Sequence, residues 1–146
     1  MDDLPPMLRH AFADLSVGMQ AEFTRRISSE DLEMFRRFSG DDNPLHCDPG
    51  YARERGFPDR VVYGMLTASY FSTLVGMYLP GENALFHGLQ VDFVKPVFPG
   101  DTLSVHGKVV AVDERFQRIE IRGIIRNQEG SKVCRAKIFA GVTDGA

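Results

Sequence analysis

Polar and apolar positions alternate with two different periods along this chain. Five stretches change between apolar and polar at roughly every second residue, which is typical of strands that bury one face. They span residues 19–27, 84–94, 102–112, 118–126 and 132–142, and turn-rich segments separate the last four. We therefore expect five strands, of which the last four form a continuous antiparallel meander.

Helical spacing replaces this alternation after the first expected strand. Ser28 is followed three residues later by Asp31, which resembles a capping box with aspartate in place of the usual glutamate. Leu32, Phe35 and Phe38 then recur at intervals of three, as expected for the apolar side of a short amphipathic helix. This helix leads the chain into a polar loop.

The loop at residues 39–50, SGDDNPLHCDPG, consists largely of residues that favour turns. Asn43 precedes a proline and is therefore biased away from helical dihedrals. An Asp-Pro pair, typical of an N-cap and the first helical position, begins a second short helix expected at residues 49–55. The segment from Asp41 to His46 is thereby anchored at both ends.

Residues 62–78, VYGMLTASYFSTLVGMY, contain no charged side chain, and their apolar residues fall on all sides of a helical wheel. Such a helix is expected to be surrounded by protein. The economical solution is one α+β domain over residues 1–146, the hot-dog fold, in which a five-stranded antiparallel sheet wraps around a long central helix. The short helical insert would carry the polar loop. Residues 1–18 are expected to be a loosely held lead-in with one helical turn.

Charge and cysteine content narrow the function classes. The 146 residues include 17 basic and 20 acidic ones, a formal net charge of −3, so nothing in the overall charge favours nucleic acid or a membrane as partner. Cys47 and Cys134 lie far apart, and the N-terminus lacks the basic and then apolar order of a signal peptide. We expect a cytoplasmic protein. The unprotected edge of its sheet favours a homodimer.

The loop and the start of the central helix carry a specific resemblance. SGDDNPLHCD at residues 39–48, followed by VVYGMLTAS at residues 61–69, resembles the MaoC-like (R)-specific enoyl-CoA hydratases, whose pattern is SGD-x-NPLH-x-D and then a helix beginning near HGM. The PVFPGD turn at residues 96–101 also matches. The resemblance implies the hot-dog fold and reversible, cofactor-free hydration of trans-2-enoyl-CoA to (R)-3-hydroxyacyl-CoA.

The residue types suit this chemistry. Hydration needs a proton removed from water, a proton delivered to the α carbon and a site for charge on the thioester oxygen. The resemblance implies that Asp41 and His46 hold the water, and that the backbone N–H near Gly64 receives the thioester oxygen at the positive end of the helix. It also implies that Asn43 orients or contacts the loop and that Ser69 lies within reach of Asp41.

Tyr63 departs from the family pattern, which commonly has histidine before the glycine. We include Tyr63 among the expected substrate-binding residues, because its side chain replaces whatever contact the usual imidazole makes. Asp42 is a second departure, since many members have an apolar or aromatic residue there. Tyr63 points to altered specificity rather than to loss of the acid-base pair, and Asp42 indicates either a different acyl group or an ordinary exposed side chain.

Alternative interpretations remain open at this stage. The same mechanism would serve a 3-hydroxyacyl-carrier-protein dehydratase, for which Arg53, Arg55 and Arg60 could form a basic patch. The protein could also be a non-catalytic acyl-thioester-binding hot-dog protein or, less favoured, a thioesterase. No metal is expected, because the adjacent His46 and Cys47 point in different directions and no second cluster completes a site. Acyl chain length is not predicted.

Overall fold

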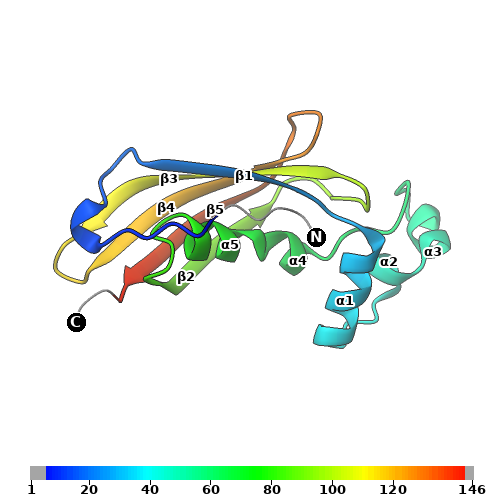
Figure 1. The fold of residues 1–146 in the computed structure, drawn as a ribbon. Coiled ribbons are helices and arrows are strands. Elements are labelled where there is room, and N and C mark those ends of the chain that lie inside the picture. Colours follow the sequence, from blue (N-terminus) through cyan, green and yellow to red (C-terminus); the bar gives the residue numbers. More distant parts are fainter. Residues whose placement is uncertain (1–5, 144–146) are drawn as a thin grey trace.

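The computed structural model describes residues 6–143 as one sheet, one central helix and a helical insert (Figure 1). The strands are β1 (Gln20–Arg26), β2 (Ala84–Phe93), β3 (Thr102–Asp113), β4 (Arg118–Arg126) and β5 (Lys132–Val142). The helices are η1 (Phe12–Asp14), α1 (Ser29–Ser39), α2 (Pro44–Cys47), α3 (Pro49–Glu54), α4 (Gly64–Ala68) and α5 (Tyr70–Met77). The expected α+β arrangement is confirmed, with a five-stranded antiparallel sheet packed against the central helix.

The strands pair in the order β1-β3-β4-β5-β2, and every neighbouring pair is antiparallel. The expected four-stranded meander is therefore wrong, because only β3, β4 and β5 pair in sequence, whereas β2 lies at the far edge beside β5. The connection from β2 to β3, residues 94–101, must cross the width of two strands. A connection of this length reaches about 26 Å when extended, more than the roughly 15 Å that three strand spacings require.

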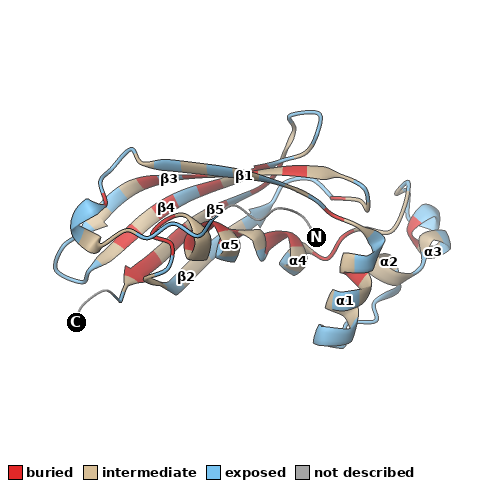
Figure 2. Cartoon of the chain, viewed as in Figure 1, coloured by how far each residue is buried: buried red, intermediate tan, exposed pale blue. Residues whose placement is uncertain are grey.

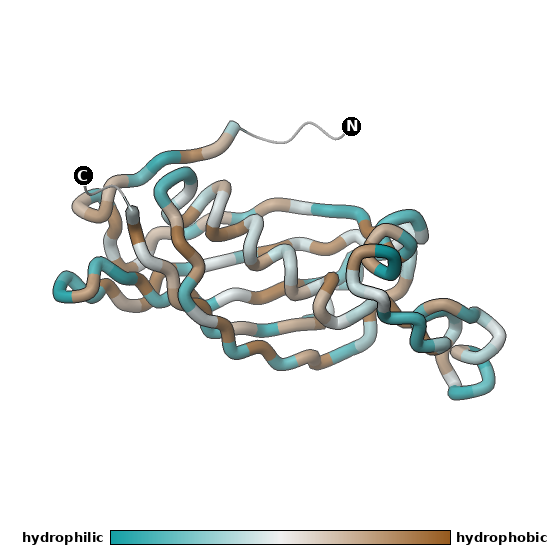
Figure 3. Tube along the Cα trace, turned by 90° about the horizontal axis from the view of Figure 1, so that it is seen from below, coloured by the Kyte–Doolittle hydropathy of each residue, from teal (hydrophilic) through white to brown (hydrophobic). Residues whose placement is uncertain are grey.

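The uncharged central segment forms two consecutive helices, α4 and α5, which meet at Ser69 and run along the strands on one face of the sheet. Figure 3 shows the same helix from the side that the sheet does not cover. The Ser69 hydroxyl donates a hydrogen bond to the Leu66 carbonyl oxygen at 2.6 Å. A serine that bonds back to its own helix commonly bends it, so the single long helix is present but interrupted at this residue.

Two glycines of the sheet let the central helix approach closely. Gly107 of β3 and Gly123 of β4 are partners across the ladder. A Cβ atom at Gly107 would lie 2.5 Å from Leu74 Cδ2, and one at Gly123 would lie 2.5 Å from Phe71 Cε1. Both helix side chains are fully buried, and the core extends along this contact between helix and sheet (Figure 2).

One face of the central helix is not covered. Met65, Ser69 and Ser72 are exposed, and their spacing places them along one side of the helix. Phe71 and Leu74 lie on the opposite side, against the sheet. The expectation of a helix surrounded by protein therefore holds for the buried side only.

Helices α1 to α3 form an insert beyond one end of the sheet, near the start of α4 (Figure 1). The capping box expected at α1 is confirmed, because the Asp31 N–H donates to the Ser28 hydroxyl at 3.2 Å and the Ser28 N–H donates to the Asp31 carboxylate at 2.8 Å. Gly40 ends α1 with φ of 76°, a left-handed conformation that favours glycine. Both features fix where the chain enters the loop with Asp41.

From Leu8 onward, the expected lead-in is held more firmly by the rest of the protein than the sequence predicted. The Leu8 N–H donates to the Met77 carbonyl at 2.8 Å, and the Glu82 N–H donates to the Leu8 carbonyl at 2.9 Å. Leu15 is buried, and the expected helical turn is the short 3-10 helix η1. Residues 1–5 of the expected lead-in lie outside the described residues.

Candidate active site

The loop between α1 and α2 places Asp41 at the surface. The Asn43 N–H donates to Asp41 Oδ1 at 3.1 Å, and the Asp41 N–H donates to the Ser39 hydroxyl at 3.2 Å. Asn43 also caps α2, because the Leu45 N–H donates to its Oδ1 at 3.0 Å. In this structure the Asn43 side chain therefore acts on the backbone of the loop.

His46 lies in α2 and is half-buried. Its Nδ1 lies 2.6 Å from the Val61 carbonyl oxygen, and because a carbonyl can only accept, we assign the proton to Nδ1. The Val61 N–H donates in turn to the Leu45 carbonyl at 3.1 Å, which ties this segment to α2. Nε2 is the ring nitrogen left for a water or a substrate.

Tyr63, the N-cap residue of α4, contacts both Asp41 and His46. Its hydroxyl donates to the Asp41 carbonyl oxygen at 2.5 Å, and its ring stacks on the His46 ring with centroids 4.2 Å apart. The side chain is buried, and burial, followed by the contact with Cys47, raises the pKa of the phenol. The residue that departs from the family pattern is thus the one that joins the two expected catalytic residues.

Helix α4 begins at Gly64 without a capping side chain, whereas a side chain caps each of α1, α2 and α3. The first N–H groups of a helix lack partners within it and form the positive end of its dipole. The ring of Phe93 lies over Gly64, since a Cβ atom there would come 3.0 Å from Phe93 Cζ. Any side chain at position 64 would therefore press on this ring.

His46 and Gly64 line one pocket of about 310 Å³ between the start of α4 and the end of β2. The other lining residues are mostly apolar and comprise Val61, Val62, Thr67, Phe93, Val94, Lys95, Pro96, Val97 and Val133. Ligand sites commonly combine such an apolar wall with a few convergent polar groups. We therefore take this pocket as the candidate site.

Two other expected features have local partners. Ser69 is exposed and donates its hydroxyl to Leu66, and no hydrogen bond joins it to Asp41 among the described residues. Its oxygen can still accept a hydrogen bond. Asp42 forms a surface ion pair with Arg36 at 2.6 Å.

The three arginines expected to form a basic patch also have partners. Arg60 forms an ion pair with Glu33 at 2.9 Å, and its side chain is only 12% exposed. Arg53 donates to a nearby backbone carbonyl at 3.3 Å, and the Arg55 guanidinium lies 4.1 Å from the centroid of the Tyr51 ring. Arg60 at least is turned inward in this structure.

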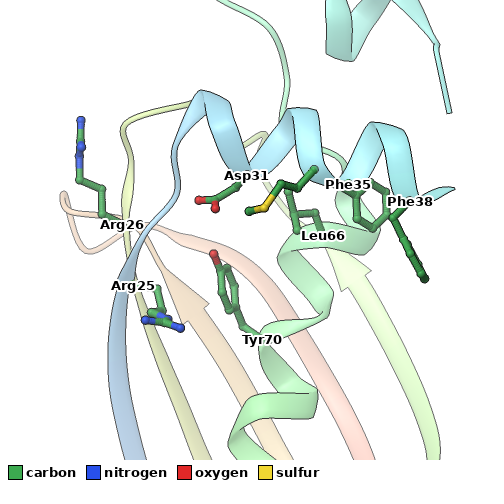
Figure 4. Close-up of a pocket in the computed structure, with 8 residues that line it drawn as sticks. Arg25, Arg26, Asp31, Phe35, Phe38, Leu66 and Tyr70 are labelled. Carbon is green, nitrogen blue, oxygen red and sulfur yellow. The ribbon is translucent and has the colours of Figure 1, made fainter. Parts of the chain in front are cut away.

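A second pocket, of about 390 Å³, lies between α1, β1 and the start of the central helix (Figure 4). Its lining residues are Arg25, Arg26, Asp31, Met34, Phe35, Phe38, Leu66 and Tyr70. Phe35 also packs on Tyr63, with ring centroids 4.8 Å apart. Asp41, His46 and Gly64 do not line this pocket, so it adjoins the candidate site without sharing its reactive groups.

Within residues 6–143, no group of three or more His, Cys, Asp or Glu side chains is placed to hold a metal ion. The neighbouring His46 and Asp48 have other partners, since His46 bonds to Val61 and Asp48 caps α3. The expectation of a metal-free site stays a prediction. In the same part of the chain, no helix is long and apolar enough to cross a membrane.

Two contributors to the site were not expected from the sequence. They are the Val61 carbonyl, which orients His46, and the Phe93 ring, which covers Gly64. Val61 lies within the matched motif, but its side chain gives no signal of what its backbone does. Phe93 contacts the site only because β2 ends beside the start of α4.

The amino-acid sequence of this chain is similar to those of known proteins. The MaoC like domain family matches residues 14–129. The (R)-specific enoyl-CoA hydratase of Aeromonas caviae is 39% identical over 100 residues, which cover 68% of this chain and 75% of that protein. The mitochondrial 3-hydroxyacyl-(acyl-carrier-protein) dehydratase of Arabidopsis thaliana is 38% identical over 100 residues, which cover 68% of this chain and 59% of the plant protein.

The fold has close counterparts as well. The unliganded R-hydratase PhaJ1 of Pseudomonas aeruginosa has a TM-score of 0.85 with this structure and 32% sequence identity. The match covers 92% of this chain and 86% of the hydratase. Similarity in sequence and in fold therefore extends over most of the chain.

Proposed function

The chain belongs to the MaoC-like dehydratase domain family, and from this premise we propose that it reversibly hydrates trans-2-enoyl-CoA to (R)-3-hydroxyacyl-CoA. Hydration and dehydration are the two directions of one hydro-lyase reaction on an acyl thioester. The similarity to the hydratase of Aeromonas caviae supports CoA as the group that carries the acyl chain as a thioester.

The observation that carries the proposal is the placement of His46 and Gly64 in one pocket, with the Asp41 loop joined to His46 through Tyr63. A carboxylate and an imidazole with a free Nε2 can divide two proton transfers between them. In the proposed reaction, Asp41 and His46 hold the water, remove its proton and deliver a proton to the α carbon. No step requires a cofactor.

The start of α4 has the complementary task. As water adds, negative charge develops on the thioester oxygen, and preorganised N–H donors stabilise such charge. The backbone N–H at Gly64 is proposed as this donor, because α4 has no capping side chain to occupy its first N–H groups. Asn43 orients the loop, and the exposed Ser69 oxygen is proposed as a further substrate contact.

Alternatively, the substrate's acyl group is carried by an acyl carrier protein rather than by CoA. The similarity to the Arabidopsis dehydratase favours it, whereas the inward position of Arg60 weakens the expected basic patch. Comparing kcat/KM for the same enoyl group on CoA and on carrier protein distinguishes the two. The cytoplasmic location stays part of the proposal on grounds of composition alone, since the plant relative is named as mitochondrial.

We further propose that two chains form a homodimer through β2. This edge strand exposes large apolar side chains, among them Leu85, which is 53% exposed, and Phe93, which is 50% exposed. The opposite edge strand, β1, exposes the charged residues Glu22 and Arg26, whereas the exposed carboxylate of β2, Asp92, pairs with Arg135 of the neighbouring strand at 3.2 Å. Charged side chains protect an edge from pairing, and apolar ones leave it open.

The catalytic assignment is tested with Asp41→Asn and His46→Gln. Loss of a general acid or base typically lowers the rate by about a hundredfold to ten-thousandfold, so we expect both variants to lose at least a hundredfold in kcat on crotonyl-CoA. Asp42→Asn is the matched control, because its carboxylate is adjacent but pairs with Arg36 at the surface. Rates like those of the parental protein in both catalytic variants would refute the assignment. Tight binding of enoyl-CoA without turnover by the parental protein would favour a non-catalytic thioester binder.

A further inference from the structure

Tyr63 connects two parts of the candidate site that belong to different segments. Its side chain is 3% exposed, whereas residues 40–44 of the loop that it contacts are all exposed. Its hydroxyl bonds to the Asp41 carbonyl oxygen at 2.5 Å, and its ring stacks on His46 with an interplanar angle of 28°. A single buried side chain therefore holds both members of the acid-base pair.

The other hydrogen bonds of Asp41 are local. They involve the Ser39 hydroxyl and the Asn43 N–H, each within two residues of Asp41. Such bonds shape a loop but do not set its distance from the rest of the protein. In the part of the chain that the structure describes, the Tyr63 hydroxyl supplies the hydrogen bond that joins Asp41 to the central helix.

Tyr63 is itself well held. The ring of Phe35 packs against it at a centroid distance of 4.8 Å, and Cys47 Sγ lies 3.6 Å from its hydroxyl oxygen. Burial and the neighbouring thiol raise the pKa of Tyr63, so the phenol stays protonated and remains a donor. Because the Asp41 carbonyl can only accept, the direction of this hydrogen bond is fixed.

We propose that Tyr63 is a positioning residue that sets the placement of the Asp41 carboxylate relative to the His46 imidazole. The inference rests on the proposed function, in which these two groups share the proton transfers. Without the hydroxyl, the loop loses its bond to the helix, while the ring can still stack on His46 and the pocket at Gly64 is unchanged. Misplacing a reacting group by about 1 Å can cost about a hundredfold in rate, so the effect falls on kcat rather than on KM.

Tyr63→Phe tests this role because it removes the hydroxyl and keeps the ring. We expect kcat for enoyl-CoA to fall by at least about tenfold, with KM within about twofold of the parental value. Tyr78→Phe is the control, because Tyr78 lies at the other end of the central helix and stacks on Phe23. An unchanged kcat in Tyr63→Phe overturns the proposal. A raised KM at unchanged kcat does so as well, because it would make Tyr63 a substrate contact.

Replacing Tyr63 with p-aminophenylalanine returns a hydrogen-bond donor at the same end of the ring. We expect this variant to regain most of the kcat that Tyr63→Phe loses. An absence of recovery would attribute the loss to packing and would overturn the positioning role.

Hydrogen exchange tests the same role without reference to activity. In Tyr63→Phe, the amides of residues 40–43, 45 and 46 should exchange at least about fivefold faster than in the parental protein, and in Tyr78→Phe they should not change. If the parental protein hydrates no enoyl thioester, the proposed function fails, and this measurement still decides whether Tyr63 holds the loop. Equal exchange in Tyr63→Phe and the parental protein would overturn the inference.

Discussion

Asp41 and His46 are held in place in different ways. His46 is fixed by the bond from its Nδ1 to the Val61 carbonyl and by the stacked Tyr63 ring. Asp41 is exposed, and Tyr63 holds its backbone rather than its carboxylate. The imidazole therefore belongs to the packed structure, whereas the position of the carboxylate depends on the conformation of a loop.

Cys134 gives a prediction for the pH dependence of stability. It is fully buried in β5, and burial, followed by the charge of Asp92, raises the pKa of its thiol to about 12. In the unfolded chain the thiol ionises near its ordinary pKa of about 8.5. Between these values the unfolded state loses a proton that the folded state keeps, so the free energy of unfolding decreases as pH rises.

Cys134→Ala removes the thiol and with it this pH-dependent contribution to the free energy of unfolding. Between about pH 8 and about pH 10, we expect the parental protein to lose about 2 kcal/mol more stability than the variant, as measured by urea denaturation. Equal losses in the two proteins would contradict the prediction. The expected difference becomes small below about pH 8, where the thiol is mostly protonated in both states.

At the residue level, the sequence was informative where the signal is local. Asp41 and His46 lie within one short motif, so the resemblance of that motif to the family pattern was sufficient to single them out as candidates, and their catalytic roles stay a prediction. The contact of Tyr63 with the Asp41 carbonyl joins residues that are 22 positions apart, and it depends on how α4 meets the loop. The same holds for Phe93 over Gly64, which requires the end of β2 to lie beside α4.

The contact of the central helix with the sheet depends on the paired glycines Gly107 and Gly123. Gly123→Ala would place a Cβ atom 2.5 Å from Phe71 Cε1, so the ring or the helix must shift. Overpacking of this kind typically costs about 1–3 kcal/mol, and we expect a loss of that size in the free energy of unfolding.

Gly76→Ala is the matched control for this prediction. Gly76 lies in α5, and among the described residues a Cβ atom there would meet nothing within 4 Å beyond its chain neighbours and the backbone of its own helix. Alanine also favours helix over glycine by up to about 1 kcal/mol. We therefore expect Gly76→Ala to be neutral or stabilising in the same denaturation experiment. Equal effects of the two substitutions would contradict the close contact at Gly123.

At the level of elements, periodicity predicted strand identity better than strand placement. The bounds of β4 and β5 agree with the expected residues 118–126 and 132–142, because alternation and flanking turns are local signals. Alternation within a strand does not indicate which other strand pairs with it, so the position of β2 beside β5 was missed. The interruption of the central helix at Ser69 was also missed, since the uncharged, apolar pattern of residues 62–78 carries no signal of it.

For the whole molecule, the proposed homodimer would use two exposed surfaces of the chain. The β2 edge exposes Leu85 and Phe93, and the central helix exposes Met65 and Ser69 on the face away from the sheet. A second copy that pairs along β2 would extend the sheet. The exposed helix face would then be available to the same partner.

Leu85→Lys tests this assembly. We expect the parental protein to have twice the mass of one chain in sedimentation equilibrium, and the variant to shift toward the monomer because a buried lysine opposes edge pairing. Thr24→Lys, on the exposed side of the β1 edge, is the control and should leave the mass unchanged. A parental protein that is monomeric at micromolar concentration would contradict the dimer.

The measurement that tests the central claim most directly is the identification of the product formed from a trans-2-enoyl-CoA in water. We expect the parental protein to produce the (R)-3-hydroxyacyl-CoA, identified by chiral separation of the released acid, and Asp41→Asn to produce it at least about a hundredfold more slowly. The proposed function would be contradicted if no enoyl thioester, on CoA or on carrier protein, is hydrated, or if the product is the (S) isomer.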